Sequence, residues 1–293
     1  MPNAKLKEFH NYLAREIRED LSGIVEFERA EGLTPYFRQY YSTWLSDGRR
    51  LQRTVNGSIT RRYSMLMFRT RLSAESDLPP LVLDVGCGFG SDSLFLAWLG
   101  CRVIGVDPSE SKIAVCKHRV KTWREFLGND TPEPEFLCGR LEDIDSLAPG
   151  TFSGVFTSEC LHHCEPVENT LLAMRTVLSD KGLALIFEAN GRNPVNLLKL
   201  GRRKKRILTR DNGRYSLYGN ENIKTPRRWR TLFRECGFKL ESTHYSRHLV
   251  NEMIGSPLMD RALCALPGKG LAAIHVSFLL SAGGTIRASG ASE

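Results

Sequence analysis

The sequence predicts an α/β fold in which a seven-stranded, mostly parallel sheet carries helices on both faces and follows a helical extension. Three observations support this class. Short apolar segments alternate with helical ones from residue 81 onward, as in a parallel sheet covered on two sides. Residues 5–72 instead repeat apolar side chains at helical spacing. The 293 residues are 41% hydrophobic and 25% charged, which is typical of a packed globular protein.

The N-terminal extension is predicted to span residues 1–76 as a set of helices. Apolar residues such as Leu6, Phe9 and Leu13 recur in steps of three and four, and no strand-like run interrupts them. Aromatic side chains crowd residues 36–44. In a helical lid, three of them could shape a substrate pocket, and packing of the helices onto the sheet explains them equally well. These three are Tyr36, Tyr40 and Tyr41.

The main domain is predicted to begin at residue 77, where a turn signal precedes the first apolar run, and to end at 283. Its first five strands are expected at 81–85, 102–106, 135–138, 152–157 and 183–188. Helices are expected near 92–99, 110–123 and 167–178. Because helical segments separate most of these strands, the connections are of the kind that joins parallel neighbours.

Two insertions interrupt the second half of this domain, a basic one at about 190–225 and a loop-rich one at about 246–270. Between them, Pro226 opens a predicted helix that runs to 236, and Gly237 follows its end, which is the usual placement of these two residues. Strands at 239–245 and 272–280 complete the seven. Residues 284–293 are expected to be a frayed tail.

The net charge of +8 is concentrated in one segment. Residues 191–230 hold thirteen basic and two acidic side chains, a net +11, so the other 253 residues carry −3. This distribution excludes a uniformly basic, nucleic-acid-coating surface. An apolar stretch followed by clustered cations is typical of a segment that lies on an anionic membrane, and a solvated loop is the alternative. The clustered cations are Arg202, Arg203, Lys204, Lys205 and Arg206.

The eight cysteines show no regular spacing, in a chain too large to need disulfide staples. A reducing cytoplasm is therefore the expected location, with peripheral membrane contact through the basic segment. The N-terminus lacks the apolar core of a signal peptide, and no run of about eighteen apolar residues occurs in the chain.

The first predicted strand runs into a glycine turn, Gly86-Cys87-Gly88-Phe89-Gly90, and then into a helix. Such a turn brings backbone N–H groups and a helix N-terminus close to a ligand, because glycine tolerates unusual dihedrals and close approach. The dinucleotide fingerprint requires glycines at its first, third and sixth positions, whereas Ser91 stands at the sixth here. The spacing favours a nucleoside ligand other than NAD.

An acidic residue ends the second predicted strand. Asp107 lies 23 residues after Asp84, which belongs to the first strand. A carboxylate at this strand end can accept hydrogen bonds from both hydroxyls of a ribose. An Asp at a strand end can also cap the next helix, but its pairing with a glycine turn at this separation favours the ribose role.

Four segments together resemble the first four motifs of class I S-adenosylmethionine-dependent methyltransferases, especially the small-molecule and lipid branch with the ubiquinone and menaquinone methyltransferases. They are Asp84-Val-Gly-Cys-Gly-Phe-Gly, Val106-Asp107, Gly139-Arg-Leu-Glu-Asp143 and residues 152–163. Residues 177–188 resemble the next motif. The likeness covers about 80–190, continues loosely to 282, and leaves out the first 70 residues. It implies a Rossmann-like sheet whose last strand is antiparallel.

The resemblance also implies S-adenosylmethionine as cofactor and a role for individual residues. Asp84 and the glycine turn would hold the methionine end, Asp107 the ribose, and Leu141 with Glu142 the adenine. The family often has an acid where this chain has Arg140, and an Asp where it has Ser153. The full expected set of cofactor contacts is Asp84, Gly86, Cys87, Gly88, Asp107, Pro108, Leu141, Glu142 and Ser158.

Candidate catalytic groups cluster at the ends of the fourth and fifth predicted strands, where open α/β sheets bind ligands. A base is needed only if the methyl acceptor must lose a proton. His163 is the first choice, with His162, Glu159 and Glu188 beside it and Asn190 in the substrate pocket. Helix capping is the alternative for either histidine. A zinc site at 160–164 is disfavoured because four donors in five residues cannot easily surround one ion, so no metal is expected.

The sequence thus predicts methyl transfer to a small-molecule or lipid-linked acceptor, with oxygen preferred as the methylated atom. An RNA methyltransferase is one alternative. The fourth strand is not followed by the Asn/Asp-Pro-Pro-aromatic tetrad typical of base amine methylation, which argues against nucleic acid. A non-catalytic binding protein with a methyltransferase-like fold is the other alternative.

Overall fold

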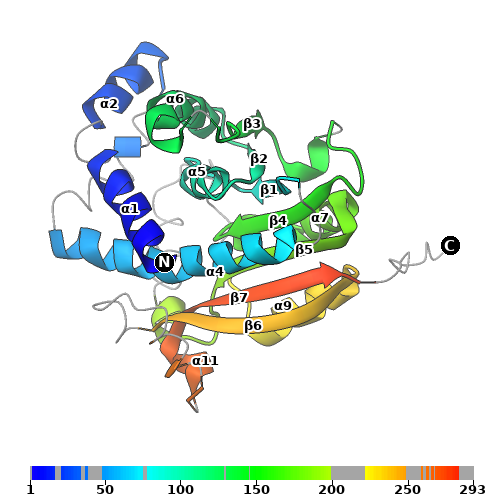
Figure 1. The fold of residues 1–293 in the computed structure, drawn as a ribbon. Helices are drawn as coiled ribbons and strands as arrows, with labels where there is room; N and C mark the ends of the chain where they lie inside the picture. The colour runs from blue at the N-terminus through cyan, green and yellow to red at the C-terminus, as the bar shows by residue number, and fades with distance from the viewer. Residues whose placement is uncertain are drawn as a thin grey trace, which may run out of the picture.

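The computed structural model describes residues 2–16, 21–33, 37–38, 48–74, 78–128, 130–144, 146–198, 222–248, 259, 262–263, 265–266 and 268–283. Its centre is a seven-stranded sheet with the order β3-β2-β1-β4-β5-β7-β6 (Figure 1). The strands are β1 (Leu81–Val85), β2 (Arg102–Asp107), β3 (Glu135–Cys138), β4 (Phe152–Ser158), β5 (Leu178–Ala189), β6 (Phe238–His248) and β7 (Ala273–Ala282).

The predicted fold class is confirmed by the pairing of these strands. β1 pairs in parallel with β2 and β4, and β2–β3 and β4–β5 are also parallel. β7 inserts between β5 and β6 and is antiparallel to both. The carboxyl ends of the parallel strands therefore share one edge of the sheet, and β7 begins at that edge.

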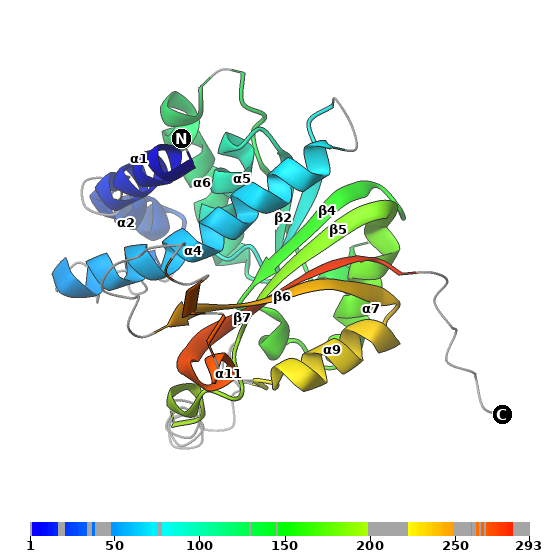
Figure 2. The same ribbon diagram turned by 60° about the horizontal axis from the view of Figure 1, so that its bottom comes forward.

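Helices flank the sheet, as Figure 2 shows. They are α1 (Pro2–Arg15), α2 (Leu21–Ala30), α4 (Gly48–Ser73), α5 (Ser91–Trp98), α6 (Glu110–Leu127), α7 (Val167–Val177), α9 (Pro226–Glu235) and α11 (Lys269–Ala272), with 3-10 turns η2 (Leu141–Asp143) and η3 (Leu161–His163). Each β-strand alternates its side chains between two apolar cores. For example, Leu185 belongs to the core with α1, α4, α5 and α6, and Ile186 to the core with α7 and α9.

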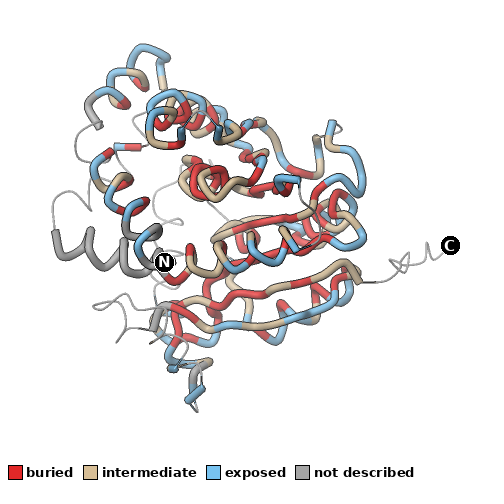
Figure 3. The backbone as a smooth tube through the Cα atoms, in the orientation of Figure 1, coloured by how far each residue is buried: buried red, intermediate tan, exposed pale blue. Residues whose placement is uncertain are grey.

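The N-terminal helices share the first of these cores with the sheet. Phe9 of α1 and Phe68 of α4 are at most 2% exposed and pack with Phe95 of α5 and Phe156 of β4 in one cluster. Figure 3 shows this buried stretch running from the helices into the central strands. The boundary at residue 76 stays a prediction, and the described N-terminal helices pack on the sheet rather than around a core of their own.

The elements match the predicted ones closely, with one difference at β5. The sequence predicts a tight turn after α7 and a strand from 183. Instead the strand starts at Leu178, which pairs with Phe152 before the register shifts. A Cβ at Gly182 would lie 2.6 Å from Leu178 Cδ1, so the glycine allows the chain to double back on the leucine. In the part of the chain that the structure describes, no helix is both long and apolar enough to span a membrane.

Candidate active site

The glycine turn lies between β1 and α5, at the carboxyl edge of the sheet. Gly86, Gly88 and Gly90 have φ of 71°, 57° and 75°, values that L side chains rarely adopt. The backbone N–H groups of Gly86 and Cys87 both donate to Val106 O, at 2.8 and 3.0 Å. These bonds tie the turn to the end of β2.

The side of the turn at Gly88 is open. A Cβ added to Gly88 would meet no atom within 4 Å, whereas one added to Gly86 would lie 2.2 Å from Cys160 Sγ. Gly86 is therefore required by packing against the loop after β4. Gly88 instead leaves free space, of the kind that a ligand approaching the backbone needs.

The side chain of Asp107, at the end of β2, borders this space. Its Oδ2 accepts a hydrogen bond from Gly88 N at 3.1 Å, and its Oδ1 accepts one from Ser109 N at 3.0 Å. Lys112 Nζ lies 3.5 Å from Oδ2. Asp107 thus braces both the turn and the loop before α6, whose N-cap is Ser109, while its carboxylate borders the open side.

Asp84 lies beneath the turn and is 2% exposed. Ser93 Oγ donates to its Oδ2 at 2.5 Å. Burial raises the pKa of Asp84 to about 7, and the hydrogen bond from Ser93 lowers it in part. A cationic group beside this carboxyl would restore its negative charge.

Arg61 of α4 reaches the same edge, and the sequence offers no signal for it. Its guanidinium contacts Asp92 in the first turn of α5, at 3.1 Å, and donates to Ser158 Oγ at 3.3 Å. Arg61 is one of several arginines on a helix outside the motifs. Only the docking of α4 on the sheet brings it to β4.

The predicted adenine contacts lie on η2, after β3. Leu141 is buried, and Glu142 accepts hydrogen bonds from Arg140 Nη2 at 2.6 Å and Thr170 Oγ1 at 3.4 Å. Arg140, the departure from the family pattern, therefore pairs with the very carboxylate that is predicted to bind adenine. Pro108 is exposed at the start of the next loop.

His162 and Glu188 form a buried pair between β5 and η3. His162 Nδ1 lies 2.6 Å from Glu188 Oε2, and Leu161 N donates to Glu188 Oε1 at 2.7 Å. Both carboxylate oxygens are thus engaged, and the pair fixes η3 to the sheet. His163, the predicted base, is partly exposed, and its ring is tilted by 45° to that of His162 with the centroids 4.0 Å apart.

Glu159 contacts a residue that no sequence pattern singles out. Its backbone has φ 55°, and its Oε1 lies 3.4 Å from Nε2 of His275 on β7. The two residues are 116 positions apart. His275 follows a loop-rich insertion and carries no motif, so only the β5–β7 pairing locates it.

Asn190 is fully buried, and its side chain forms hydrogen bonds with backbone groups. Nδ2 donates to Gly270 O and Ala273 O, both at 2.8 Å, and Oδ1 accepts from Arg192 N. These bonds join the end of β5 to the start of β7. A substrate contact by Asn190 stays a prediction. Tyr36, Tyr40, Tyr41 and the cluster Arg202–Arg206 lie outside the described residues.

Three cysteines lie near the turn, of which Cys87 is buried and Cys160 and Cys164 are partly exposed. Burial raises the pKa of the Cys87 thiol well above its usual range. A hydrogen bond with Cys160 lowers the pKa of Cys164. Within the described ranges, no group of three or more His, Cys, Asp or Glu side chains could hold a metal ion, and seven cysteines are free.

A family model described as a methyltransferase domain matches residues 83–186, which include the end of β1, the glycine turn, Asp107 and β4. The match covers about a third of the chain and supports its likeness to class I S-adenosylmethionine-dependent methyltransferases over that region. The match ends two residues before Glu188. It therefore leaves α4, β6 and β7 outside the matched region.

Two sequence relatives and one solved structure illustrate what the chain is similar to. A ubiquinone biosynthesis O-methyltransferase of Bradyrhizobium diazoefficiens is 34% identical over 37% of the chain and 40% of its own length. An S-adenosyl-L-methionine-dependent Diels-Alderase, iccD of Talaromyces variabilis, is 27% identical over 47% of the chain and 44% of its own length. The chain thus spans less than half the length of these two relatives. Magnesium protoporphyrin IX methyltransferase of Synechocystis PCC 6803, solved with bound SAH, has a TM-score of 0.52, 19% identity and coverage of 83% and 97%, a likeness of fold.

The residues at the glycine turn fit S-adenosylmethionine. Gly88 leaves space that a Cβ would fill, Asp107 presents a carboxylate to it, and buried Asp84 would gain a counter-ion from a cationic ligand. A nucleoside with an amino acid arm carries the matching groups, a ribose diol and an ammonium.

Proposed function

We propose that this chain transfers a methyl group from S-adenosylmethionine to a small-molecule or lipid-linked acceptor, at an oxygen atom. The observation that carries the proposal is the glycine turn braced by Asp107, with open space at Gly88. S-adenosylmethionine supplies an electrophilic methyl group. The protein then has to align an acceptor with it and exclude water.

Each part of the cofactor has a residue of matching chemistry. Asp84 would pair with the ammonium of the methionine arm, and Asp107 would accept hydrogen bonds from the ribose hydroxyls. Leu141 would contact the adenine through its backbone. Glu142 would contact it through its carboxylate once that group shares its hydrogen bond from Arg140.

The preference for oxygen rests on relatives and on chemistry. Several curated relatives are ubiquinone biosynthesis O-methyltransferases. An oxygen acceptor must lose a proton, and Glu159, His162, His163 and Glu188 supply imidazole and carboxylate groups near the carboxyl ends of β4 and β5. Any of the partly exposed members of this set could take that proton.

Binding of S-adenosylhomocysteine to the wild type and Asp107→Asn tests the proposal. The variant keeps the size of the side chain but loses its charge and one accepting oxygen, so we expect its affinity to fall at least about tenfold. Isothermal calorimetry measures this fall, and Asp143→Asn on η2 is a surface control. No binding by the wild type, or equal binding by Asp107→Asn, contradicts the assignment.

Methyl transfer itself needs a separate experiment, because the family includes a relative described as a Diels-Alderase. Cofactor with a labelled methyl group is incubated with the protein and a fractionated lysate of the host. We expect label in a lipid or small-molecule fraction. Label in RNA with steep salt dependence would favour the RNA alternative, and cofactor binding with no label anywhere would favour a non-catalytic binding protein.

We also propose contact with an anionic membrane through Arg202–Arg206. Leu197 and Leu198, directly before this segment, are 50% and 67% exposed, which gives it an apolar neighbour. Each surface cation contributes on the order of 1 kcal/mol to binding of anionic lipid. Sedimentation with phosphatidylglycerol vesicles should fall when these five residues become Gln. Phosphatidylcholine vesicles are the control, and unchanged sedimentation rejects the proposal.

A further inference from the structure

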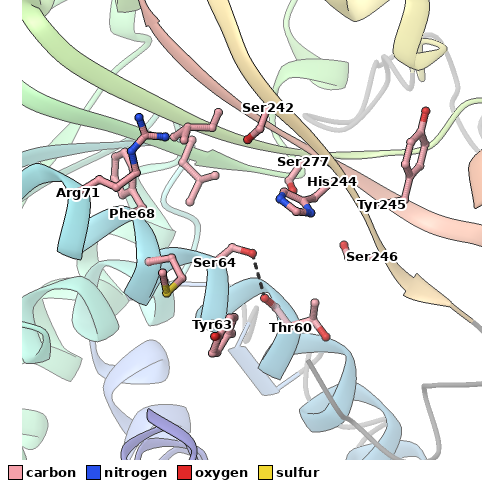
Figure 4. A pocket seen from close by; sticks show the side chains of 13 residues that line it. Thr60, Tyr63, Ser64, Phe68, Arg71, Ser242, His244, Tyr245, Ser246 and Ser277 are labelled. Atoms are coloured by element: carbon pink, nitrogen blue, oxygen red, sulfur yellow. Dashed lines mark hydrogen bonds between the residues drawn. The ribbon is translucent and has the colours of Figure 1, made fainter. Parts of the chain in front are cut away.

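A cavity of about 110 Å³ lies between α4 and the strands β5, β7 and β6 (Figure 4). It is on the same face of the sheet as the core of α1, α4, α5 and α6, because Leu185 and Leu279 line it and belong to or pack on that core. Its lining is Thr60, Tyr63, Ser64, Met67, Phe68, Arg71, Leu185, Ser242, His244, Tyr245, Ser246, Ser277 and Leu279.

The lining of the cavity combines a mainly apolar surface with several polar side chains. Seven lining residues carry hydroxyl groups, one is a histidine, and none is acidic. Ser246 and Ser277 are only 5% and 4% exposed, and both line the cavity. Hydroxyl groups that line a cavity can exchange hydrogen bonds with a polar ligand inside it.

The strand register connects this cavity to the candidate active site. Ser277 pairs with His244 of β6, and His275 pairs with Ser246. Because alternate residues share a face, His275 lies on the cavity side, one step closer to the carboxyl edge of the sheet. Its Nε2 is 3.4 Å from Glu159 Oε1, and Glu159 directly follows Ser158.

Helix α4 also connects the cavity to the candidate active site. Thr60 lines the cavity, and its neighbour Arg61 donates to Ser158 Oγ at 3.3 Å. The end of the cavity near Thr60 and Ser246 therefore borders the edge where Asp84 and the glycine turn lie. Arg71 marks the opposite end, since three helical turns separate it from Thr60.

We propose that this cavity binds the methyl acceptor, a small hydroxylated molecule or head group with an anionic substituent, and that the Glu159–His275 pair receives its hydroxyl proton. This inference rests on the proposed function. The serine hydroxyls and His244 suit a hydroxylated ligand, the apolar side chains of Met67 and Leu279 suit a ring, and Arg71 suits a carboxylate or phosphate.

The proposed reaction moves one proton and one methyl group. The acceptor O–H bond breaks and its proton passes to the imidazole of His275. The oxygen uses the freed electron pair to bond the methyl carbon, and the methyl–sulfur bond breaks with its electrons on sulfur. The carboxylate of Glu159, 3.4 Å from Nε2, stabilises the imidazolium that forms when His275 takes the proton.

The test uses the full chain, labelled cofactor and the small-molecule and lipid fractions of a host lysate. Ser277→Phe places a ring in the cavity, and Ser281→Phe makes the same change on the same strand outside its lining. We expect label incorporation to fall at least about tenfold in Ser277→Phe only. Calorimetry with S-adenosylhomocysteine should give all proteins the same affinity, which shows that they are folded.

Two less disruptive variants test the proposal if Ser277→Phe does not fold. The double change Ser246→Ala with Ser277→Ala removes the hydroxyls without adding bulk and should lower incorporation. His275→Gln should lower it about 100-fold, the range of a lost general base. Wild-type incorporation in the serine variants overturns the binding site, and wild-type incorporation in His275→Gln overturns the proton acceptor. Wild type that binds no S-adenosylhomocysteine overturns the proposed function, and this inference with it.

Discussion

Asp84 shows how one residue couples burial to ligand chemistry. Its pKa is raised to about 7 because burial disfavours the charged form, although Ser93 donates a short hydrogen bond to it. In water the carboxyl of Asp titrates near 3.9. A protein keeps such a buried acid where a cation is to be bound, which agrees with the proposed contact to an ammonium group.

The stability of the protein should depend on pH through Asp84. The unfolded chain loses this proton near pH 4 and the folded chain near pH 7, so the contribution of Asp84 is intact below about 4 and is lost as the pH rises through 7. Between those values the free energy of unfolding should fall more steeply in wild type than in Asp84→Asn, which resembles the protonated form. Urea unfolding at a series of pH values measures both slopes. Parallel profiles would contradict the raised pKa.

Substitutions of Glu188 are expected to lower the free energy of unfolding. Glu188→Ala removes the partner of both His162 Nδ1 and Leu161 N and should cost about 3–5 kcal/mol. Glu188→Gln keeps one accepting oxygen and should cost about 1–3 kcal/mol. Chemical unfolding measures the series. Glu241→Gln, at a partly exposed site on β6, is the control and should stay within about 0.5 kcal/mol; equal losses in all three would argue against a buried pair.

At the scale of elements, the docking of α4 depends on a glycine in β4. A Cβ at Gly154 would lie 2.7 Å from Leu72 Cδ1 and 2.8 Å from Phe68 Cζ. Both side chains are at most 4% exposed, so neither can move into open space. Since Phe68 also lines the cavity, this contact sets the width of the proposed acceptor site.

Gly154→Ala should therefore destabilise the protein by about 1–3 kcal/mol through overpacking. Gly23→Ala on α2 is the matched control, because a Cβ there meets nothing within 4 Å. In a helix interior alanine is favoured over glycine by roughly 0.5–1 kcal/mol, so the control should be stabilised. Thermal unfolding shows whether each substitution raises or lowers the stability. A stabilised Gly154→Ala would mean that α4 does not pack tightly against β4.

At the scale of the molecule, one ion pair joins the N-terminal helices to the glycine turn. Glu16, just after α1, accepts from Arg119 Nε and Nη2 of α6 at 2.8 and 2.7 Å, and both side chains are at most 1% exposed. Arg119 Nη1 also donates to Phe89 O and to Ser91 Oγ. The Arg119 guanidinium thereby links the extension to the glycine turn.

Glu16→Ala should leave that guanidinium buried without its carboxylate and cost about 3–5 kcal/mol. Affinity for S-adenosylhomocysteine should fall as well, because Arg119 supports the turn. The exposed pair Arg124–Glu133 is the comparison, and Glu133→Ala should change stability by no more than about 1 kcal/mol. Unfolding and calorimetry give the two readouts; unchanged affinity in a destabilised Glu16→Ala would limit the pair to a structural role.

Much of the fold and the arrangement of the glycine turn follow from local sequence. The strands β1 to β4 lie within a residue or two of the predicted ranges, and Gly86, Gly88 and Asp107 meet as expected. These features depend on neighbours in the chain: alternation sets a strand, and only glycine fits positive φ at a turn. By contrast, the early start of β5 depends on pairing between Leu178 and Phe152, which local periodicity does not encode.

The sequence alone determined the order of elements, the glycine turn and the acids at the ends of β1 and β2, because each is written in residues close together in the chain. Only the tertiary structure decided which distant side chains meet. Glu159 reaches His275 through the pairing of β5 with β7, Arg61 reaches Ser158 through the docking of α4, and Glu16 reaches Arg119 across 103 residues. Register and helix docking are set by packing of whole surfaces, and a linear pattern does not specify them.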